Sequence, residues 1–255
     1  MPHTARHALL LLSLLPTSAW AIVNLEGLHL KSPPPGWSGA LDFALSGNEG
    51  NTRLVNLDAS LRLNWRRDPV RRFLIASQGY SESRGQKARD RSFLHLRHIH
   101  ELHQRRAWEA FVQSERDAFA RLQLRALLGG GLRLGLGEAT PGHTTLLGLG
   151  AFYSRERLSD GGGGEDLDFG QWRANLYLIH QSEPDPHRRT WLTAYLQPDL
   201  TAIHDLRILT TAGLAMDLGR GWTFTWQINL NYDARPPFRV GRYDLNYRAG
   251  ISRKF

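Results

Sequence analysis

The chain has 255 residues, a formal net charge of +8 and no cysteine. Its 41% hydrophobic content excludes a disordered chain, and the lack of cysteine excludes disulfides, thiolate metal sites, cysteine nucleophiles and a lipidated cysteine. A mean hydropathy of −0.40 excludes a multi-helix membrane protein. It is compatible with a membrane β-barrel, because half of each barrel strand is polar.

Residues 1–21 have the features of a secretory signal peptide. A weakly basic start precedes an apolar run over 8–15 and the cleavage-type sequence Ala19-Trp20-Ala21. The apolar run is shorter than the roughly 20 residues of a spanning helix, and the alternative is a buried N-terminal helix. We expect export and cleavage after Ala21, a lead-in over 22–36 and an outer-membrane domain over 37–255.

Beyond this lead-in, apolar and polar residues alternate with a period of two. Residues 55–66 alternate strictly, and 206–218, 222–232 and 243–252 repeat the pattern. The pattern and the turn residues together predict twelve strands, at 37–46, 53–66, 70–83, 91–102, 106–118, 122–136, 144–156, 169–181, 190–198, 206–218, 221–232 and 242–255.

These strands are longer than those of most soluble proteins, and they suffice to cross an apolar band about 25 Å tall. Aromatic residues at strand ends, such as Trp37, Trp65, Trp222 and Tyr243, fit the interfacial girdles of a membrane barrel. We therefore predict an all-β fold, a transmembrane antiparallel up-and-down β-barrel of about 12 strands. A soluble β-sandwich or a lipocalin-like barrel is the alternative.

The connections between the predicted strands alternate in length, as expected of a barrel with both termini on one side. Short turns are predicted at 67–69, 103–105, 137–143, 182–189 and 219–220. Longer loops are predicted at 84–90, 157–168, 199–205 and 233–241.

One segment, 96–128, is ambiguous, because its leucine, alanine, glutamate and arginine content also suits two amphipathic helices. The alternation of Trp108, Ala110 and Val112 with Glu109 and Phe111 favours strands.

The basic charge does not indicate nucleic-acid binding. Only three basic residues are lysines, and the arginines are spread along the chain. We expect them to line polar surfaces and to face anionic lipid, namely outer-membrane lipid and lipopolysaccharide.

The polar face of the strands is expected to line the interior of the barrel. Buried charges of both signs should pair across strands, filling the interior or lining a narrow path for small solutes. The residues expected there include Asp42, Asn56, Asp58, Arg62, Glu115, Arg125, Asp244 and Arg248.

Two groups of residues raise the question of chemistry. His95, His98, His100 and His103 lie close in sequence, and His98 and His100 share a strand face that could bind Zn or Ni. Ser114 with a histidine of the preceding strand could serve a hydrolase. A third metal ligand cannot be named, and no G-x-S-x-G motif occurs, so we expect no cofactor and no enzymatic activity.

Several phrases, in order over 36–255, resemble the salt-induced outer-membrane protein family, a bacterial group defined mainly as a domain of unknown function. They are Gly36-Trp37-Ser38-Gly39 with Ser46-Gly47-Asn48, Phe111-Val112-Gln113-Ser114-Glu115-Arg116-Asp117, and Asn231-Tyr232-Asp233-Ala234-Arg235-Pro236-Pro237. The resemblance implies strands over 106–136, an outer-membrane barrel and no known catalysis.

The last predicted strand is expected to carry the assembly signal. Phe255 ends the chain, and Ile251, Ala249 and Tyr247 share its face at even spacing. By resemblance to other barrels, we expect recognition of this strand by the barrel-assembly machinery.

The sequence thus predicts a non-enzymatic outer-membrane β-barrel with a role in envelope or osmotic adaptation, the latter taken from the name of the resembled family. The alternative is an outer-membrane lipid hydrolase that uses histidine and serine residues.

Overall fold

The computed structural model describes residues 34–50, 53–103, 105–137, 142–159, 166–185, 187–237 and 240–253. The predicted signal peptide and Phe255 lie outside the described residues. The twelve strands, in chain order, are β1 (Gly36–Asn48), β2 (Leu54–Arg67), β3 (Val70–Ser83), β4 (Gln86–Glu101), β5 (Arg106–Asp117), β6 (Leu122–Gly135), β7 (His143–Leu158), β8 (Leu167–Asp185), β9 (Arg188–Pro198), β10 (Leu206–Gly219), β11 (Trp222–Asp233) and β12 (Tyr243–Arg253).

All twelve strands form one sheet, in which each strand is antiparallel to its sequence neighbours. This confirms the prediction of an all-β, up-and-down arrangement of twelve strands. β5 and β6 occupy the ambiguous segment, so the alternation of its side chains, and not its helix propensity, decides its structure.

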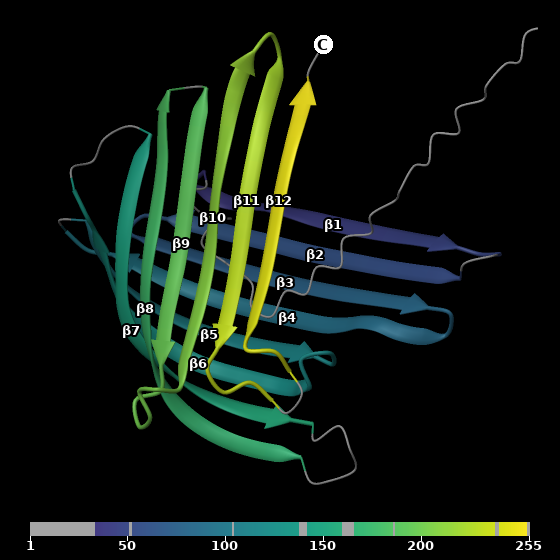
Figure 1. Cartoon of the computed structure of the whole chain (residues 1–255). Coiled ribbons are helices and arrows are strands. Elements are labelled where there is room, and N and C mark those ends of the chain that lie inside the picture. Colours follow the sequence, from purple (N-terminus) through teal and green to yellow (C-terminus); the bar gives the residue numbers. More distant parts are fainter. Residues whose placement is uncertain are drawn as a thin grey trace, which may run out of the picture.

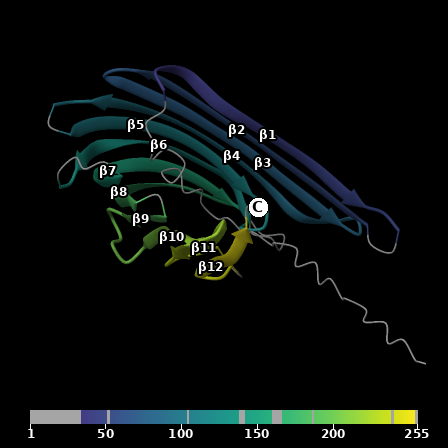
Figure 2. The ribbon, with the colours of Figure 1, turned by 90° about the horizontal axis from the view of Figure 1, so that it is seen from above.

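The sheet curls strongly, so that the strands near its two ends face one another across the concave side (Figures 1 and 2). The strand order runs from β1 to β12, and the pairing among the described residues does not join these two edge strands. Closure of the barrel by contact between β1 and β12 stays a prediction.

The strand ends form two rims of the curled sheet, and the connections differ between them. We call the end with Gly36 and Arg253 the terminus rim; its connections are 68–69, 102–105, 136–142, 186–187 and 220–221. The opposite end is the loop rim, with connections 49–53, 84–85, 118–121, 159–166, 199–205 and 234–242.

The predicted long loop at 84–90 is wrong. β3 and β4 continue to a two-residue turn at Arg84 and Gly85, whose φ angles are 51° and 77°. Two positive φ angles suit the tight type I′ hairpin, which matches the twist of the flanking strands. Lys87 and its neighbours therefore extend the strand, although their charge resembles that of a loop.

The concave side, called the inner face, is defined by the register. Residues that lie opposite each other in an antiparallel pair point to the same side of the sheet. One inner row crosses seven strands, through Asp42, Ser60, Ser77, Phe93, Glu115, Arg125 and Glu156. The convex side, called the outer face, carries the residues between them.

Buried apolar side chains on the inner face form two small clusters among the described residues. The first joins β3, β4 and β5, and the second joins β8, β9 and β10. Their buried members are Phe73, Ile75, Phe93, Ile99 and Ala107 in the first, and Tyr177, Ile179, Tyr195 and Leu209 in the second. Charged and polar side chains, together with Phe111 and Phe152, lie between the two clusters.

The part of the chain that the structure describes has no helix long and apolar enough to cross a membrane.

Candidate functional site: a charged inner face

Glu156 of β7 is the centre of the first charge cluster. Its side chain is fully buried, and it accepts two hydrogen bonds from the Arg207 guanidinium, from Nη1 at 2.6 Å and from Nη2 at 3.0 Å. Arg125 donates from Nη2 to Glu156 at 3.2 Å and from Nη1 to Glu115 at 3.2 Å. Paired charge-assisted hydrogen bonds of this kind fix geometry as well as energy. The cluster therefore ties β5, β6, β7 and β10 together at one level.

Arg207 extends this cluster to the C-terminal strands. Its Nε donates to Asp233 of β11 at 3.0 Å, and the register places these two residues opposite each other. One arginine thus bridges two carboxylates from strands far apart in the sequence.

Glu109 of β5 is the centre of a second cluster, closer to the terminus rim. It accepts hydrogen bonds from Arg133 Nη1 at 3.2 Å and from Arg97 Nη1 at 3.4 Å. The hydroxyl of Tyr177, on β8, donates to Glu109 at 2.8 Å. This last contact passes over β6 and β7, which lie between β5 and β8 in the sheet.

Gly148 of β7 makes room for that contact. A methyl group at its Cα would lie 2.0 Å from atoms of the Tyr177 ring, on the neighbouring strand. Glycine is therefore required for the tyrosine to lie over β7 and to reach Glu109.

A third group holds the loop 199–205 against the sheet. Arg173 of β8 is buried and donates from Nη2 to Asp205 at 2.6 Å and from Nη1 to the backbone oxygen of Gln197 at 2.9 Å. Asp199 accepts hydrogen bonds from the Thr201 hydroxyl at 2.6 Å and from the backbone N–H groups of Thr201 and Ala202 at 2.7 and 2.9 Å. Burial disfavours the Asp199 carboxylate, but these hydrogen bonds outweigh it and hold the pKa of Asp199 below its ordinary value.

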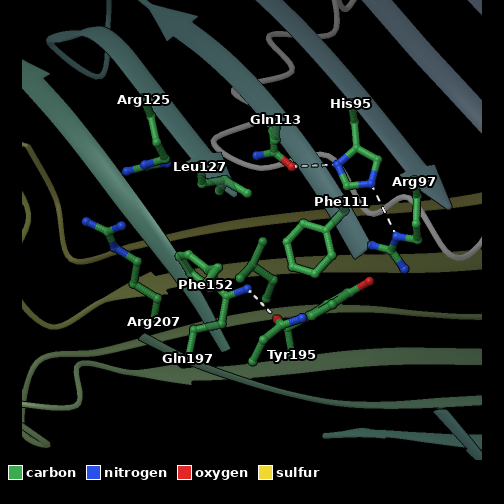
Figure 3. Close-up of a pocket in the computed structure, with 12 residues that line it drawn as sticks. His95, Arg97, Phe111, Gln113, Arg125, Leu127, Phe152, Tyr195, Gln197 and Arg207 are labelled. Atoms are coloured by element: carbon green, nitrogen blue, oxygen red, sulfur yellow. Dashed lines mark hydrogen bonds between the residues drawn. The ribbon is translucent and has the colours of Figure 1, made fainter. Parts of the chain in front are cut away.

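His95 lies among three phenylalanine rings on the inner face. Figure 3 shows the polar contacts of its two ring nitrogens with Gln113 and Arg97. Arg97 Nε lies 3.3 Å from Nε2, and Nδ1 lies 3.0 Å from Gln113 Oε1. An arginine can only donate, so Nε2 accepts and Nδ1 carries the proton that it donates to Gln113. The geometry assigns a neutral imidazole with a fixed tautomer.

A small cavity of about 50 Å³ lies between these groups (Figure 3). It has room for a few water molecules and not for a drug-sized ligand. A larger hollow of about 320 Å³ opens at the loop rim, with Leu158, Phe169 and Pro236 in its walls. Arg125 and Arg207 line both spaces, so the cluster around Glu156 separates the hollow from the cavity.

The inner-face residues predicted on β1 and β2 lie in a more open part of the sheet. Arg62 Nη2 is 3.4 Å from Asp42, and Ser60 Oγ donates to Asp42 at 3.0 Å. Asp58 forms an ion pair with Arg89 of β4, and Asn56 accepts a hydrogen bond from Ser81 at 2.7 Å.

The register gives the last two predicted inner-face residues, Asp244 and Arg248, a place on β12. They lie opposite Asn231 and Gln227, on the same face as Asp233. That all eight predicted residues line the interior of a closed barrel remains a prediction.

The predicted assembly-signal residues that the structure describes lie on the outer face of β12. Tyr247, Ala249 and Ile251 lie opposite Ile228, Trp226 and Phe224 of β11. Their role in assembly remains a prediction.

The two groups considered for chemistry are not assembled into a reactive site. Ser114 lies on the outer face, opposite Leu94 of β4. Leu94 is four residues from His98 on that strand, so Ser114 and His98 are about 13 Å apart along the strand direction. His95 is on the other face. The described residues include no cluster of three or more His, Asp or Glu that could hold a metal ion.

Sequence reasoning missed the central members of the clusters, Glu156, Arg207, Glu109, Arg133 and Arg97. A local signal was present for Glu109, Arg133 and Arg207, which have apolar outer-face neighbours on both sides, but not for Glu156, which lies between Arg155 and Arg157. Alternation identifies the face, but it does not show which charges meet across it.

Residues 41–255 match the model of a family described as "Protein of unknown function, DUF481". The chain belongs to this family. This confirms the prediction that the chain belongs to a family of unknown function. The description of the matched family does not mention salt induction.

No curated protein matches this DUF481 chain. Among solved structures, it is similar to the translocator domain of the autotransporter NalP from Neisseria meningitidis, with a TM-score of 0.39 and 14% sequence identity. The similarity covers 84% of this chain and 86% of the translocator chain.

Proposed function

We propose that this DUF481 protein is a non-enzymatic β-barrel of the bacterial outer membrane that contributes to the mechanical and osmotic integrity of the envelope. One observation carries the proposal. The outer face exposes large apolar side chains, while the inner face buries ion pairs, which is the reverse of a water-soluble protein.

The outer face has far more exposed apolar surface than a soluble monomer tolerates. Exposed large residues occur on strands from β1 to β12; Leu41 is 75% exposed, Leu128 63% and Tyr247 76%. A hydrocarbon environment would solvate this surface. The strands have 11 to 19 residues, enough to cross an apolar band when tilted.

Aromatic residues form two bands on this outer face. Toward the terminus rim lie Trp37, Trp65, Trp108 and Trp222. Toward the loop rim lie Tyr80, Tyr153, Trp172, Tyr232 and Tyr243. Two such girdles with an apolar zone between them mark the two interfaces of a bilayer.

The rims give an orientation. Short turns face the periplasm in outer-membrane barrels, and longer loops face outward. We therefore place the terminus rim toward the periplasm and the loop rim toward lipopolysaccharide, with the barrel-assembly machinery acting on β12 during insertion.

The filled interior supports a structural role over a wide pore. The clusters around Glu156 and Glu109 join strands that are three apart in the sheet, β7 with β10 and β5 with β8, and the cavity between them is small. A hollow of about 570 Å³ beside β1, with Asp42, Asp58 and Ser60 in its lining, leaves room for a narrow solute path there. The osmotic component of the proposal is supported by the motif resemblance to the salt-induced family.

Fractionation of cells tests the location. We expect the protein in the outer-membrane fraction, with β-type circular dichroism in detergent and with heat-modifiable mobility on gels, because a barrel stays folded in detergent until it is heated. Recovery in the soluble periplasm, or helical dichroism, would contradict the proposal.

A further inference from the structure

The outer face of β2–β5 carries a basic and aromatic patch at the terminus rim. The register aligns Trp65 with Arg72, Arg72 with His98, and His100 with Trp108. Arg67 and Arg106 lie on the same face at the strand ends. We call these residues the terminus-rim patch: Trp65, Arg67, Arg72, His98, His100, Arg106 and Trp108.

Arg72 is held in place by neutral groups alone. Its guanidinium carbon lies 5.0 Å from the centre of the Trp65 ring, and its Nε lies 3.1 Å from His98 Nδ1. Among the described residues, no carboxylate pairs with it. A cation that is held by an aromatic face and an imidazole keeps its charge available to an anion.

The contact with Arg72 determines which ring nitrogen of His98 carries the proton. Arginine only donates, so His98 Nδ1 accepts, and the neutral ring carries its proton on Nε2. The Trp108 ring packs on His98 at 4.9 Å and on His100 at 5.6 Å between ring centres. The patch thus presents an ordered arginine, with its two Nη groups, beside an N–H donor on His98.

The arginines at the other end of the outer face differ. At the loop rim, Arg155 and Arg157 both pair with Asp168, at 2.9 and 3.1 Å. These two arginines thus share a carboxylate partner within the protein, whereas no carboxylate pairs with Arg72 among the described residues.

The apolar zone begins directly beside the patch. Leu63, Leu74 and Leu96 lie opposite one another in a row, two residues from Trp65, Arg72 and His98 toward the middle of the strands. A ligand that satisfies both parts has an anionic head and acyl chains.

We propose that the terminus-rim patch binds an anionic glycerophospholipid, with its phosphate at Arg72 and His98 and its acyl chains on the leucine row. This inference rests on the proposed function, which places the terminus rim at the periplasmic leaflet. That leaflet consists of phospholipid, so the site takes a phospholipid and not lipopolysaccharide.

Native mass spectrometry of the full protein in detergent tests the site, with phosphatidylglycerol, zwitterionic phosphatidylcholine, a lipid A glycolipid and inorganic phosphate as probes. We expect wild type to retain phosphatidylglycerol in preference to the other three. Arg72→Gln should weaken phosphatidylglycerol binding about fivefold, the contribution of one arginine near an anionic surface. Arg72→Lys keeps the charge and should retain most of the binding, and Arg155→Gln is the matched control that should leave it unchanged.

Equal binding by wild type and Arg72→Gln, or an equal loss in Arg155→Gln, would overturn the site. Stronger binding of the lipid A glycolipid, or full displacement by inorganic phosphate, would overturn the assignment to a phospholipid. Flotation with liposomes separates the two proposals. If wild type fails to float, the proposed function and the site both fail; if all variants float and phosphatidylglycerol binding does not depend on Arg72, only the site fails.

Discussion

Glu156→Ala is expected to destabilise the folded protein by about 3–5 kcal/mol, because it removes the carboxylate that two buried guanidinium groups share. The side chain is fully buried and holds Arg207 through two hydrogen bonds and Arg125 through a third. Both arginines are almost fully buried, and each keeps only one other carboxylate partner, Asp233 for Arg207 and Glu115 for Arg125. Urea unfolding in lipid vesicles, followed by tryptophan fluorescence, measures the change.

Asp168→Asn is the matched control for this prediction. Asp168 also binds two arginines, Arg155 and Arg157, but this group lies exposed at the loop rim. Exposed ion pairs contribute little, so the midpoint of unfolding should not move measurably. If Asp168→Asn and Glu156→Ala had equal effects, the inner face would be as hydrated as the rim, and the filled interior would be wrong.

Trp226→Arg is expected to cost about 2–4 kcal/mol, the penalty for an arginine on the lipid face near the middle of a bilayer. Trp226 lies on the outer face of β11, opposite Leu214 and Ala249. Leu61→Arg, at mid-strand on the outer face of β2, should behave in the same way. Unfolding in vesicles against wild type gives both values.

Gln227→Arg, at the next residue, should cost much less. Its side chain lies on the inner face beside Asn229, whose Oδ1 accepts its hydrogen bond at 3.3 Å. Equal costs at 226 and 227 would show that the two faces have been assigned wrongly.

The strands and their faces could be predicted because they depend on local alternation. β11 shows this clearly: its tryptophan, phenylalanine, isoleucine and tyrosine residues alternate with threonine, glutamine and asparagine. In 96–128, the alternation favoured strands, and strands are what form, although the residue types there also suit helices. It failed at 84–90, because charged residues after a tight turn have the composition of a loop and still pair as a strand.

The charged inner face could be predicted only in part. Glu115 and Arg125 were expected there, and they meet in an ion pair across β5 and β6. The contact of Tyr177 with Glu109 could not be predicted, because it depends on how far the sheet curls and on the space above Gly148. Such contacts are set by the relative shift of distant strands, which no local pattern encodes.

The position of Arg72 illustrates the same limit. Its sequence neighbours indicate a polar strand end, whereas the register alone brings it between Trp65 and His98. Three strands are needed to form the patch, so its chemistry becomes visible only once the register is known.

Contact with lipid along β11 tests the central claim most directly. Because the chain has no cysteine, a single cysteine can carry a fluorophore at each position in turn. In vesicles with brominated phospholipid, we predict strong quenching at 226, 228 and 230 and weak quenching at 227, 229 and 231. Quenching that does not alternate, or that is weak at all six positions, would contradict a barrel whose outer face lies in the membrane.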